Sequence, residues 1–167
     1  MDPIHVTTDL EYAKKKFEAI MELVDKGRVI PHYPNSIDGH LIGRMGEDAV
    51  FQWAKRAGLK PFPNYQVTNQ GCDIFLQGPR LRLEVKAWKI EQFKWGGRAI
   101  SEKQMAGVRY KADRIVWCSV NLPTSEVKIE GWSDVKDFDG APIVTKGKLD
   151  LRSYQLEKVR AIESFVQ

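Results

Sequence analysis

Two predicted β-strands and the turn between them occupy the sequence Gly71-Cys72-Asp73-Ile74-Phe75-Leu76-Gln77-Gly78-Pro79-Arg80-Leu81-Arg82-Leu83-Glu84-Val85-Lys86-Ala87-Trp88. With the turn at Gly78-Pro79, three apolar pairs face each other across the hairpin: Cys72 with Val85, Ile74 with Leu83, and Leu76 with Leu81. A shift of one strand by a single residue would destroy this agreement, so the sequence specifies the register of the hairpin.

The same register places Asp73 opposite Glu84, and Lys86 projects from the same face two residues further along. Carboxylates that are directly opposed across a hairpin repel each other. A hard divalent cation such as Mg²⁺ would remove this conflict, because it prefers oxygen ligands. A lysine beside such a site can hold or activate a water molecule, so the pattern predicts a metal-dependent phosphodiesterase. The alternative is a hairpin that carries these charges on a solvated face.

The order Asp73…Glu84-Val85-Lys86 resembles the core motif of the PD-(D/E)XK nuclease superfamily, which is also called the restriction-endonuclease-like fold. Residues 43–50 resemble the first core helix of this family, and residues 104–110 resemble the helix that follows its Glu-x-Lys strand. Residues 113–120 fit the next core strand. The motif departs from the family pattern in that a cysteine, not a proline, precedes the aspartate.

The resemblance implies an α/β fold with a mixed central β-sheet flanked by helices and a restriction-endonuclease-like core. It implies that Asp73 and Glu84 bind Mg²⁺, for which Mn²⁺ substitutes, and that the Val85 carbonyl is a possible third ligand. Lys86 would orient or deprotonate the attacking water, and Gln104 would position water or substrate. The cleavage products would carry 5′-phosphate and 3′-hydroxyl ends.

Glu47 has two interpretations. Its place in the predicted helix matches a glutamate of the family, which makes it a candidate ligand of a second metal or of a water-mediated site. A helix predicted to begin at Leu41 or Gly43 would also put Glu47 in the first turn, where it would simply complement the helix dipole.

The chain of 167 residues has the length of one ordinary domain. Residues 1–40 are expected to form a helix over 9–26 and a connector, both packed on the core, and residues 41–167 to form the nuclease core with a C-terminal strand and helix. The other expected elements are a short strand at 65–68, a polar segment at 90–99, a helix capped by Ser101, strands at 114–120 and 127–132, a helical turn at 133–138 and a final helix over 153–166. The strand at 127–132 is a candidate edge strand.

Composition places the protein in the cytoplasm. Apolar residues make up 43% of the chain and charged residues 29%, as in soluble globular proteins. No apolar run is long enough to span a bilayer, and the N-terminus lacks the layout of a signal peptide. Cys72 and Cys118 lie in predicted core strands without a metal-ligand spacing, which indicates reduced, buried thiols.

Positive charge gathers around the motif. The segment from Pro79 to Arg114 has a net charge of +6, whereas the rest of the chain has a net charge of −2. Such an imbalance suits a polyanionic substrate, although a solvated face with uneven charge is the simpler alternative. The residues expected to contact nucleic acid are Lys89, Lys94, Trp95, Arg98 and Lys103. Trp95 would either stack on a base or cover the edge of the core.

The predicted function is metal-dependent hydrolysis of DNA by a structure- or end-directed nuclease. A small type II-like restriction endonuclease is one alternative, and the Glu-Val-Lys strand followed by a glutamine is also similar to archaeal-type Holliday junction resolvases. A non-catalytic DNA-binding module of the same fold is an alternative of a different class. RNA stays open as a substrate, a homodimer is compatible with the sequence, and no membrane partner is expected.

Overall fold

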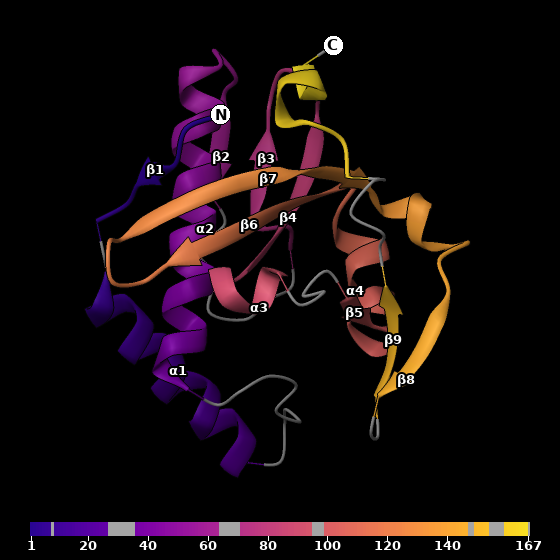
Figure 1. The fold of residues 1–167 in the computed structure, drawn as a ribbon. Coiled ribbons are helices and arrows are strands. Elements are labelled where there is room, and N and C mark those ends of the chain that lie inside the picture. Colours follow the sequence, from indigo (N-terminus) through magenta and orange to yellow (C-terminus); the bar gives the residue numbers. More distant parts are fainter. Residues whose placement is uncertain are drawn as a thin grey trace.

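The computed structural model describes residues 1–7, 9–26, 36–63, 71–94, 99–146, 149–153 and 159–166. These residues form a mixed α/β fold in which helices flank a curved sheet (Figure 1). The helices and strands are β1 (Ile4–His5), α1 (Leu10–Asp25), α2 (Ile37–Arg56), β2 (Pro61–Pro63), β3 (Ile74–Leu76), β4 (Leu81–Lys89), α3 (Ile90–Lys94), β5 (Ala99–Ser101), α4 (Glu102–Lys111), β6 (Arg114–Asn121), β7 (Glu126–Asp134), β8 (Ile143–Lys146) and β9 (Leu149–Ser153). Two 3-10 helices, η1 (Val135–Phe138) and η3 (Ile162–Val166), complete the described elements.

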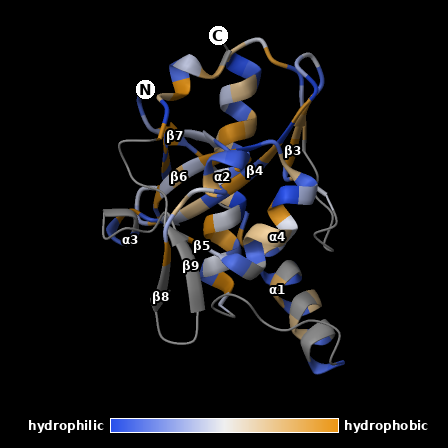
Figure 2. Ribbon diagram, turned by 90° about the vertical axis from the view of Figure 1, so that its right-hand side faces the viewer, coloured by the Kyte–Doolittle hydropathy of each residue, from blue (hydrophilic) through white to orange (hydrophobic). Residues whose placement is uncertain are grey.

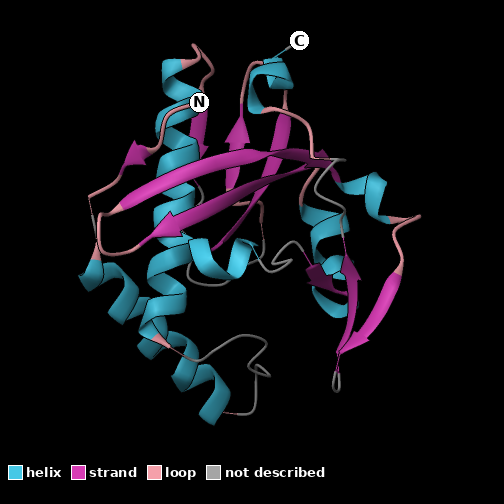
Figure 3. Cartoon of the chain, viewed as in Figure 1, coloured by secondary structure: helices cyan, strands magenta, loops and turns pink. Residues whose placement is uncertain are grey.

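The main sheet has the strand order β1-β7-β6-β4-β3-β2. Its central strands β4 and β6 are parallel, and every other pair of neighbours is antiparallel. Helix α4 lies between β4 and β6 in the chain, because parallel neighbours need a crossover connection. A second sheet with the order β5-β9-β8 lies beside this crossover (Figure 3). The sequence had not predicted this second sheet.

The hairpin register predicted from the sequence is confirmed. Ile74 pairs with Leu83, and Leu76 pairs with Leu81, on strands β3 and β4. Three of these side chains, those of Ile74, Leu76 and Leu83, are completely buried, which explains why the alternation of apolar residues fixes the register.

Helix α2 covers one face of the main sheet, and hydrophobic residues gather along it and the strands that it contacts (Figure 2). It begins at Ile37, earlier than the expected Leu41 or Gly43, because the Ser36 side chain caps it by accepting a hydrogen bond of 3.1 Å from the Gly39 backbone N–H. Gly46 lets the helix approach β4 closely: a Cβ atom on this residue would lie 2.7 Å from the Ala87 Cβ.

Helix α1 packs against α2, as expected for the N-terminal segment. The Arg44 guanidinium lies 4.6 Å from the centre of the Tyr12 ring, and the Phe17 ring meets His40 edge-on at 5.9 Å. The first part of the expected connector, residues 29–35, lies outside the described residues, and residues 37–40, also expected to belong to the connector, are instead the first turn of α2.

The opposite face of the main sheet carries a second apolar cluster. Trp117 is fully buried there between Trp88, with ring centres 5.5 Å apart, and Phe138, at 5.9 Å. Met105 and Val108 of α4 cover this cluster. The expected helix capped by Ser101 and the strand at 114–120 are confirmed. The helical turn expected at 133–138 is confirmed for residues 135–138, whereas Ser133 and Asp134 belong to β7.

Three sequence expectations are corrected. Strand β7 is not the edge of the sheet, because the short strand β1 pairs with it at Ile4 and Val127. Part of the polar segment is helical, since residues 90–94 form α3. Among the described residues of the expected final helix, Ser153 ends β9 and only Ile162–Val166 are helical, as the short η3. The expected strand at 65–68 lies outside the described residues.

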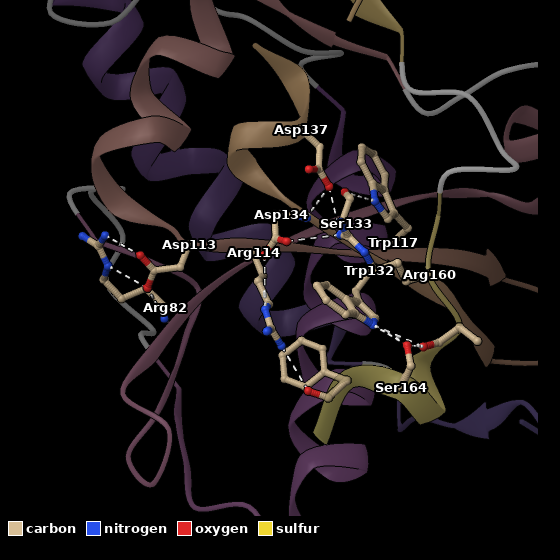
Figure 4. Close-up of polar contacts among 12 residues, drawn as sticks. Arg82, Asp113, Arg114, Trp117, Trp132, Ser133, Asp134, Asp137, Arg160 and Ser164 are labelled. Atoms are coloured by element: carbon tan, nitrogen blue, oxygen red, sulfur yellow. Dashed lines mark hydrogen bonds and ion pairs between the residues drawn. The ribbon is translucent and has the colours of Figure 1, made fainter. Parts of the chain in front are cut away.

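Tertiary contacts explain the lost C-terminal helix. Backbone N–H and C=O groups of Arg160 pair with those of Trp132 on β7 at 2.9 Å each, so the chain is extended there. The Phe165 ring then packs edge-on against Trp132 at 5.4 Å and against Trp53 at 5.2 Å. The Arg114 guanidinium lies 4.1 Å from the Trp132 ring centre and donates to the Phe165 carbonyl at 3.0 Å (Figure 4).

No helix in the described ranges has an apolar stretch of the length that a bilayer requires.

Candidate active site

Hydrogen bonds to β4 hold Asp73 beside Glu84 at the open end of the hairpin. Asp73 lies just before β3 begins, and its backbone N–H donates to the Leu83 carbonyl at 2.9 Å. The Asp73 carboxylate accepts a hydrogen bond of 2.7 Å from the Val85 backbone N–H. Both contacts fix Asp73 beside the middle of β4, where the Glu84 side chain is only 2% exposed.

Two lysines hold the buried Glu84 carboxylate. Lys86 Nζ donates to Glu84 Oε1 at 2.6 Å, as expected for a residue two places along the same strand. Lys111 Nζ lies 2.7 Å from the other oxygen, Glu84 Oε2. The two lysine side chains are themselves 22% and 13% exposed, so these ion pairs are largely shielded from water.

Burial and neighbouring charges shift the pKa values of these groups. Removal from water, followed by the charges of Glu84 and Glu47, raises the pKa of Asp73 to about 8. Burial would also raise the pKa of Glu84, but Lys86 and Lys111 outweigh it and leave this pKa below its ordinary value. Burial would lower the pKa of Lys86, but Glu84 and Asp73 outweigh it and raise this pKa. Glu84 is therefore a carboxylate and Lys86 an ammonium at neutral pH.

Glu47 reaches this group of charges from α2. Because α2 begins at Ile37, Glu47 lies in the middle of the helix and not in its first turn, where the acidic residue is Asp38. The helix dipole acts only within the first turn, so it does not account for a glutamate at this position. Glu47 forms an ion pair with Arg44 at 3.6 Å, and its charge raises the pKa values of Asp73 and Lys86.

We call these residues the carboxylate–lysine cluster; its members are Glu47, Asp73, Glu84, Lys86 and Lys111. Its donors suit a hard divalent cation, because carboxylate oxygens are the ligands that Mg²⁺ and Mn²⁺ prefer. After burial, repulsion by Glu84 and Glu47 raises the pKa of Asp73, and a divalent cation would relieve this repulsion. Across the described parts of the chain, however, no three His, Cys, Asp or Glu side chains are already arranged as a metal site. A cation would have to displace a lysine from Glu84.

Lys111 is a member of the cluster that the sequence reasoning missed. The signal was present in the chain order, because a helix that connects two parallel neighbouring strands ends where the second strand begins. Arg114 at the start of β6 pairs with Leu83, so the last residue of α4 comes next to Glu84. A capping pattern and a crossover rule together would have predicted this position.

Two other predicted site residues, Gln104 and Lys89, form structural contacts away from the carboxylate–lysine cluster. Gln104 completes a capping box: it accepts from the Ser101 backbone N–H at 3.4 Å, while its own backbone N–H donates to the Ser101 side chain at 3.2 Å. Lys89 forms an ion pair with Asp38 of α2 at 3.2 Å. The pattern Ser-x-x-Gln was a sequence signal for this structural role of Gln104.

The expected DNA contacts of the segment after β4 are only partly within the described residues. Lys94 ends α3, but its side chain, like that of Lys103 on α4, is not among those described. Trp95 and Arg98 lie outside the described residues. Their assignment to nucleic acid stays a prediction.

Both cysteines are free thiols. Cys118 is completely buried in β6, and burial raises its pKa. Cys72 precedes Asp73, and its pKa is also raised by burial and by the neighbouring Asp73. Neither thiol is activated as a nucleophile, which requires a lowered pKa.

The sequence matches no model of a known protein family and has no significant match among curated proteins. Function is therefore inferred from the chemistry of the carboxylate–lysine cluster.

Proposed function

We propose that this protein is a metal-dependent nuclease that hydrolyses phosphodiester bonds of DNA. The observation that carries the proposal is the placement of Asp73 beside the buried Glu84, with Lys86 Nζ 2.6 Å from the Glu84 carboxylate. Helix α2, the β3–β4 hairpin, α4 and β6 follow one another in the order that a restriction-endonuclease-like core implies. We propose this core as the interpretation of the fold.

The proposed metal ligands are Asp73, Glu84 and the Val85 carbonyl, with Glu47 reaching the metal directly or through water. The cation, Mg²⁺ with Mn²⁺ as a substitute, would polarise the phosphoryl group and lower the pKa of the attacking water. Asp73 is already held toward β4 by its hydrogen bond from the Val85 backbone N–H, so little rearrangement of this carboxylate is needed.

Lys86 would orient the water and the phosphate instead of deprotonating the water. Glu84 and Asp73 raise its pKa above the ordinary value, so it is a proton donor and not a base in this environment. A positioned ammonium can still stabilise the negative charge that develops on the phosphate oxygens.

We infer DNA as the substrate from the charge distribution and from the resemblance. The segment from Pro79 to Arg114 carries a net charge of +6, and it includes both lysines of the cluster. A structure- or end-directed nuclease that leaves 5′-phosphate and 3′-hydroxyl ends is the first choice. The free thiols support a cytoplasmic location.

The test is incubation of the protein with supercoiled, linear, single-stranded and branched DNA, and with single-stranded RNA, in Mg²⁺, Mn²⁺ or EDTA. Asp73→Asn and Glu84→Gln, which keep the shape of each side chain, should each abolish cleavage without unfolding the protein. A matched control is Glu130→Gln, because Glu130 on β7 is also shielded and paired with a lysine, Lys128, at 2.9 Å. This control variant should cleave like the original protein.

Cleavage that persists in excess EDTA or in folded Asp73→Asn would overturn the proposed mechanism. Tight DNA binding without cleavage in any metal would instead identify a non-catalytic binding module. The DNA panel separates the remaining alternatives, since preference for four-way junctions indicates a resolvase and cutting at a fixed duplex sequence indicates a restriction endonuclease.

A further inference from the structure

Lys111 contacts Glu84 from a different element than the motif strand. It is the last residue of α4, and its Nζ lies 2.7 Å from Glu84 Oε2. The backbone around it is fixed to β4, because Arg82 donates to the Tyr110 carbonyl at 2.8 Å and the Asp113 backbone N–H donates to the Arg82 carbonyl at 2.8 Å. The end of the helix is thus held in place, and only the flexible lysine side chain is free to turn.

A single carboxylate oxygen of Glu84 cannot bind the Lys111 ammonium and a metal ion at the same time. One of its oxygens is taken by Lys86 and the other by Lys111, and the side chain is almost completely buried. A bound Mg²⁺ would sit about 2.1 Å from its ligand oxygen, which would bring it against an ammonium on that same oxygen. The two positive charges would repel strongly in this shielded environment.

The formal charges lead to the same conclusion. With Glu47, Asp73 and Glu84 ionised, three negative charges face the two positive charges of Lys86 and Lys111, so the cluster has a net charge of −1. A divalent cation added to this set makes the net charge +1, and the departure of one lysine returns it to zero. Lys86 is attracted by Glu84, Asp73 and Glu47 and lies on the same strand as Glu84, so it keeps acidic neighbours when the metal enters. Lys111 reaches Glu84 from α4 and not from the strand that carries Glu84. We therefore expect Lys111, and not Lys86, to leave Glu84 when the metal binds.

We propose that Lys111 is a displaceable counterion, which holds the Glu84 carboxylate in the metal-free protein and gives up this place to the divalent cation. The inference rests on the proposed function, since it takes Glu84 as a metal ligand. Lys111 is in this sense a positioning residue: it keeps a buried carboxylate ionised and in place until the metal arrives. The Lys111 ammonium also competes with the metal for Glu84, so a neutral side chain at position 111 should strengthen metal binding. A substitution that only damaged the fold would weaken metal binding.

The experiment is calorimetric titration of the metal-free protein with Ca²⁺ and with Mn²⁺, in the absence of DNA. Lys111→Met, which keeps the length of the side chain without its charge, should bind both ions about tenfold more tightly, by the size of effect that one adjacent charge has on a carboxylate. Lys111→Arg, which keeps the charge, should bind them like the original protein. Lys128→Met is the control, because Lys128 pairs with Glu130 at 2.9 Å and not with Glu84.

A second measurement covers the case in which Lys111→Met folds poorly. Lys111→Gln keeps a hydrogen-bond donor for Glu84 and should show the same tightening. In thermal unfolding with EDTA, both neutral variants should melt below the original protein, and Ca²⁺ should raise their melting temperatures by more than it raises that of the original protein.

The outcomes separate this inference from the proposed function. Unchanged or weaker metal affinity in a folded neutral variant, with binding still abolished by Asp73→Asn, would overturn the role of Lys111 alone. Absence of metal binding in the original protein would overturn the proposed metal site and the exchange with it.

Discussion

Arg82 and Asp113 join the start of β4 to the end of α4 through several hydrogen bonds. The Arg82 guanidinium contacts both Asp113 carboxylate oxygens, at 2.8 and 3.2 Å, and the Arg82 backbone N–H donates to the same carboxylate at 2.9 Å (Figure 4). Side-chain hydrogen bonds from Arg82 lower the pKa of Asp113. Because Lys111 lies two residues before Asp113, this pair positions the lysine that reaches Glu84.

We expect Asp113→Ala to lower the free energy of unfolding by about 1–2 kcal/mol, because it removes charge-assisted hydrogen bonds to both backbone and side chain. The measure is urea unfolding at neutral pH. Asp139→Ala is the matched control: Asp139 also accepts two contacts from an arginine, Arg109, at 3.1 and 3.0 Å, but it is 64% exposed. That change should cost less than about 0.5 kcal/mol. Equal losses in the two variants would show that Asp113 has no special structural role.

The pKa of Asp73 predicts how the stability of the metal-free protein depends on pH. Its folded-state pKa of about 8 lies above the ordinary value of 3.8, so the folded protein binds the proton more tightly than the unfolded chain. The stabilising contribution of this proton is complete below the ordinary pKa and is lost as the pH rises toward 8, with a slope of at most about 1.4 kcal/mol per pH unit.

The prediction is measured in EDTA between about pH 6 and pH 8, where Glu84 and Asp113 stay ionised because their pKa values are lowered. Asp73→Asn imitates the neutral side chain and should flatten the decline. With saturating Ca²⁺ the free energy of unfolding should instead rise with pH, since the cation binds the deprotonated carboxylate. A metal-free protein whose stability is constant over this range, or rises, would contradict the assigned pKa.

Glu47 and its neighbour Asp48 form a matched pair on α2. Both carboxylates form ion pairs with Arg44, at 3.6 and 3.0 Å, but only the charge of Glu47 acts on Asp73. Glu47→Gln should therefore lower the pKa of Asp73 and weaken Mn²⁺ binding by about tenfold, as expected for loss of one carboxylate near the metal. Asp48→Asn should leave Mn²⁺ affinity unchanged. Metal affinity that falls equally in both variants would assign the effect to Arg44 and the helix instead.

Replacement by alanine should change the stability of the protein in opposite directions at two glycines of α2. A Cβ at position 46 would lie 2.7 Å from the Ala87 Cβ and 3.3 Å from Val85 Cγ1, so Gly46→Ala should force the helix away from β4 and cost about 1–3 kcal/mol. A Cβ at position 43 would meet nothing within 4 Å, so Gly43→Ala should stabilise the helix by about 0.5–1 kcal/mol. Thermal unfolding of the two variants tests the predicted difference in sign, and destabilisation by Gly43→Ala would contradict it.

Lys86 should matter for turnover more than for DNA affinity. Lys86→Ala removes the ammonium that touches Glu84 at 2.6 Å, while Lys111 still pairs with that carboxylate in the metal-free protein, so the variant should fold. Cleavage should fall by at least about 100-fold, the usual loss for one positioned donor at a developing charge. Binding of a DNA duplex in Ca²⁺ should change only modestly. A proportional loss of affinity and turnover would show that Lys86 is a phosphate contact without a role in the chemical step.

The sequence by itself determined the hairpin and the part of the site that lies on it. Alternating apolar residues and a Gly-Pro turn fix the register locally, and this register predicts that Asp73 and Glu84 lie close together with Lys86 nearby. The structure pairs residues 74–76 with 81–83 in this register and holds the Asp73 carboxylate on the Val85 backbone N–H. Helix α4 was also predictable, because its capping residue Ser101 acts within a single turn.

The tertiary structure decided the rest of the cluster. Lys111 and Glu47 come from two different helices, and their approach depends on the α4 crossover and on the close packing of α2 at Gly46. The C-terminal segment likewise has a helical pattern of apolar residues, yet its contacts with Trp132 hold Arg160 in an extended bridge. The periodicity of apolar residues indicates which face of a helix or strand is buried. It does not indicate which other helix or strand covers that face, because this depends on packing between residues far apart in the chain.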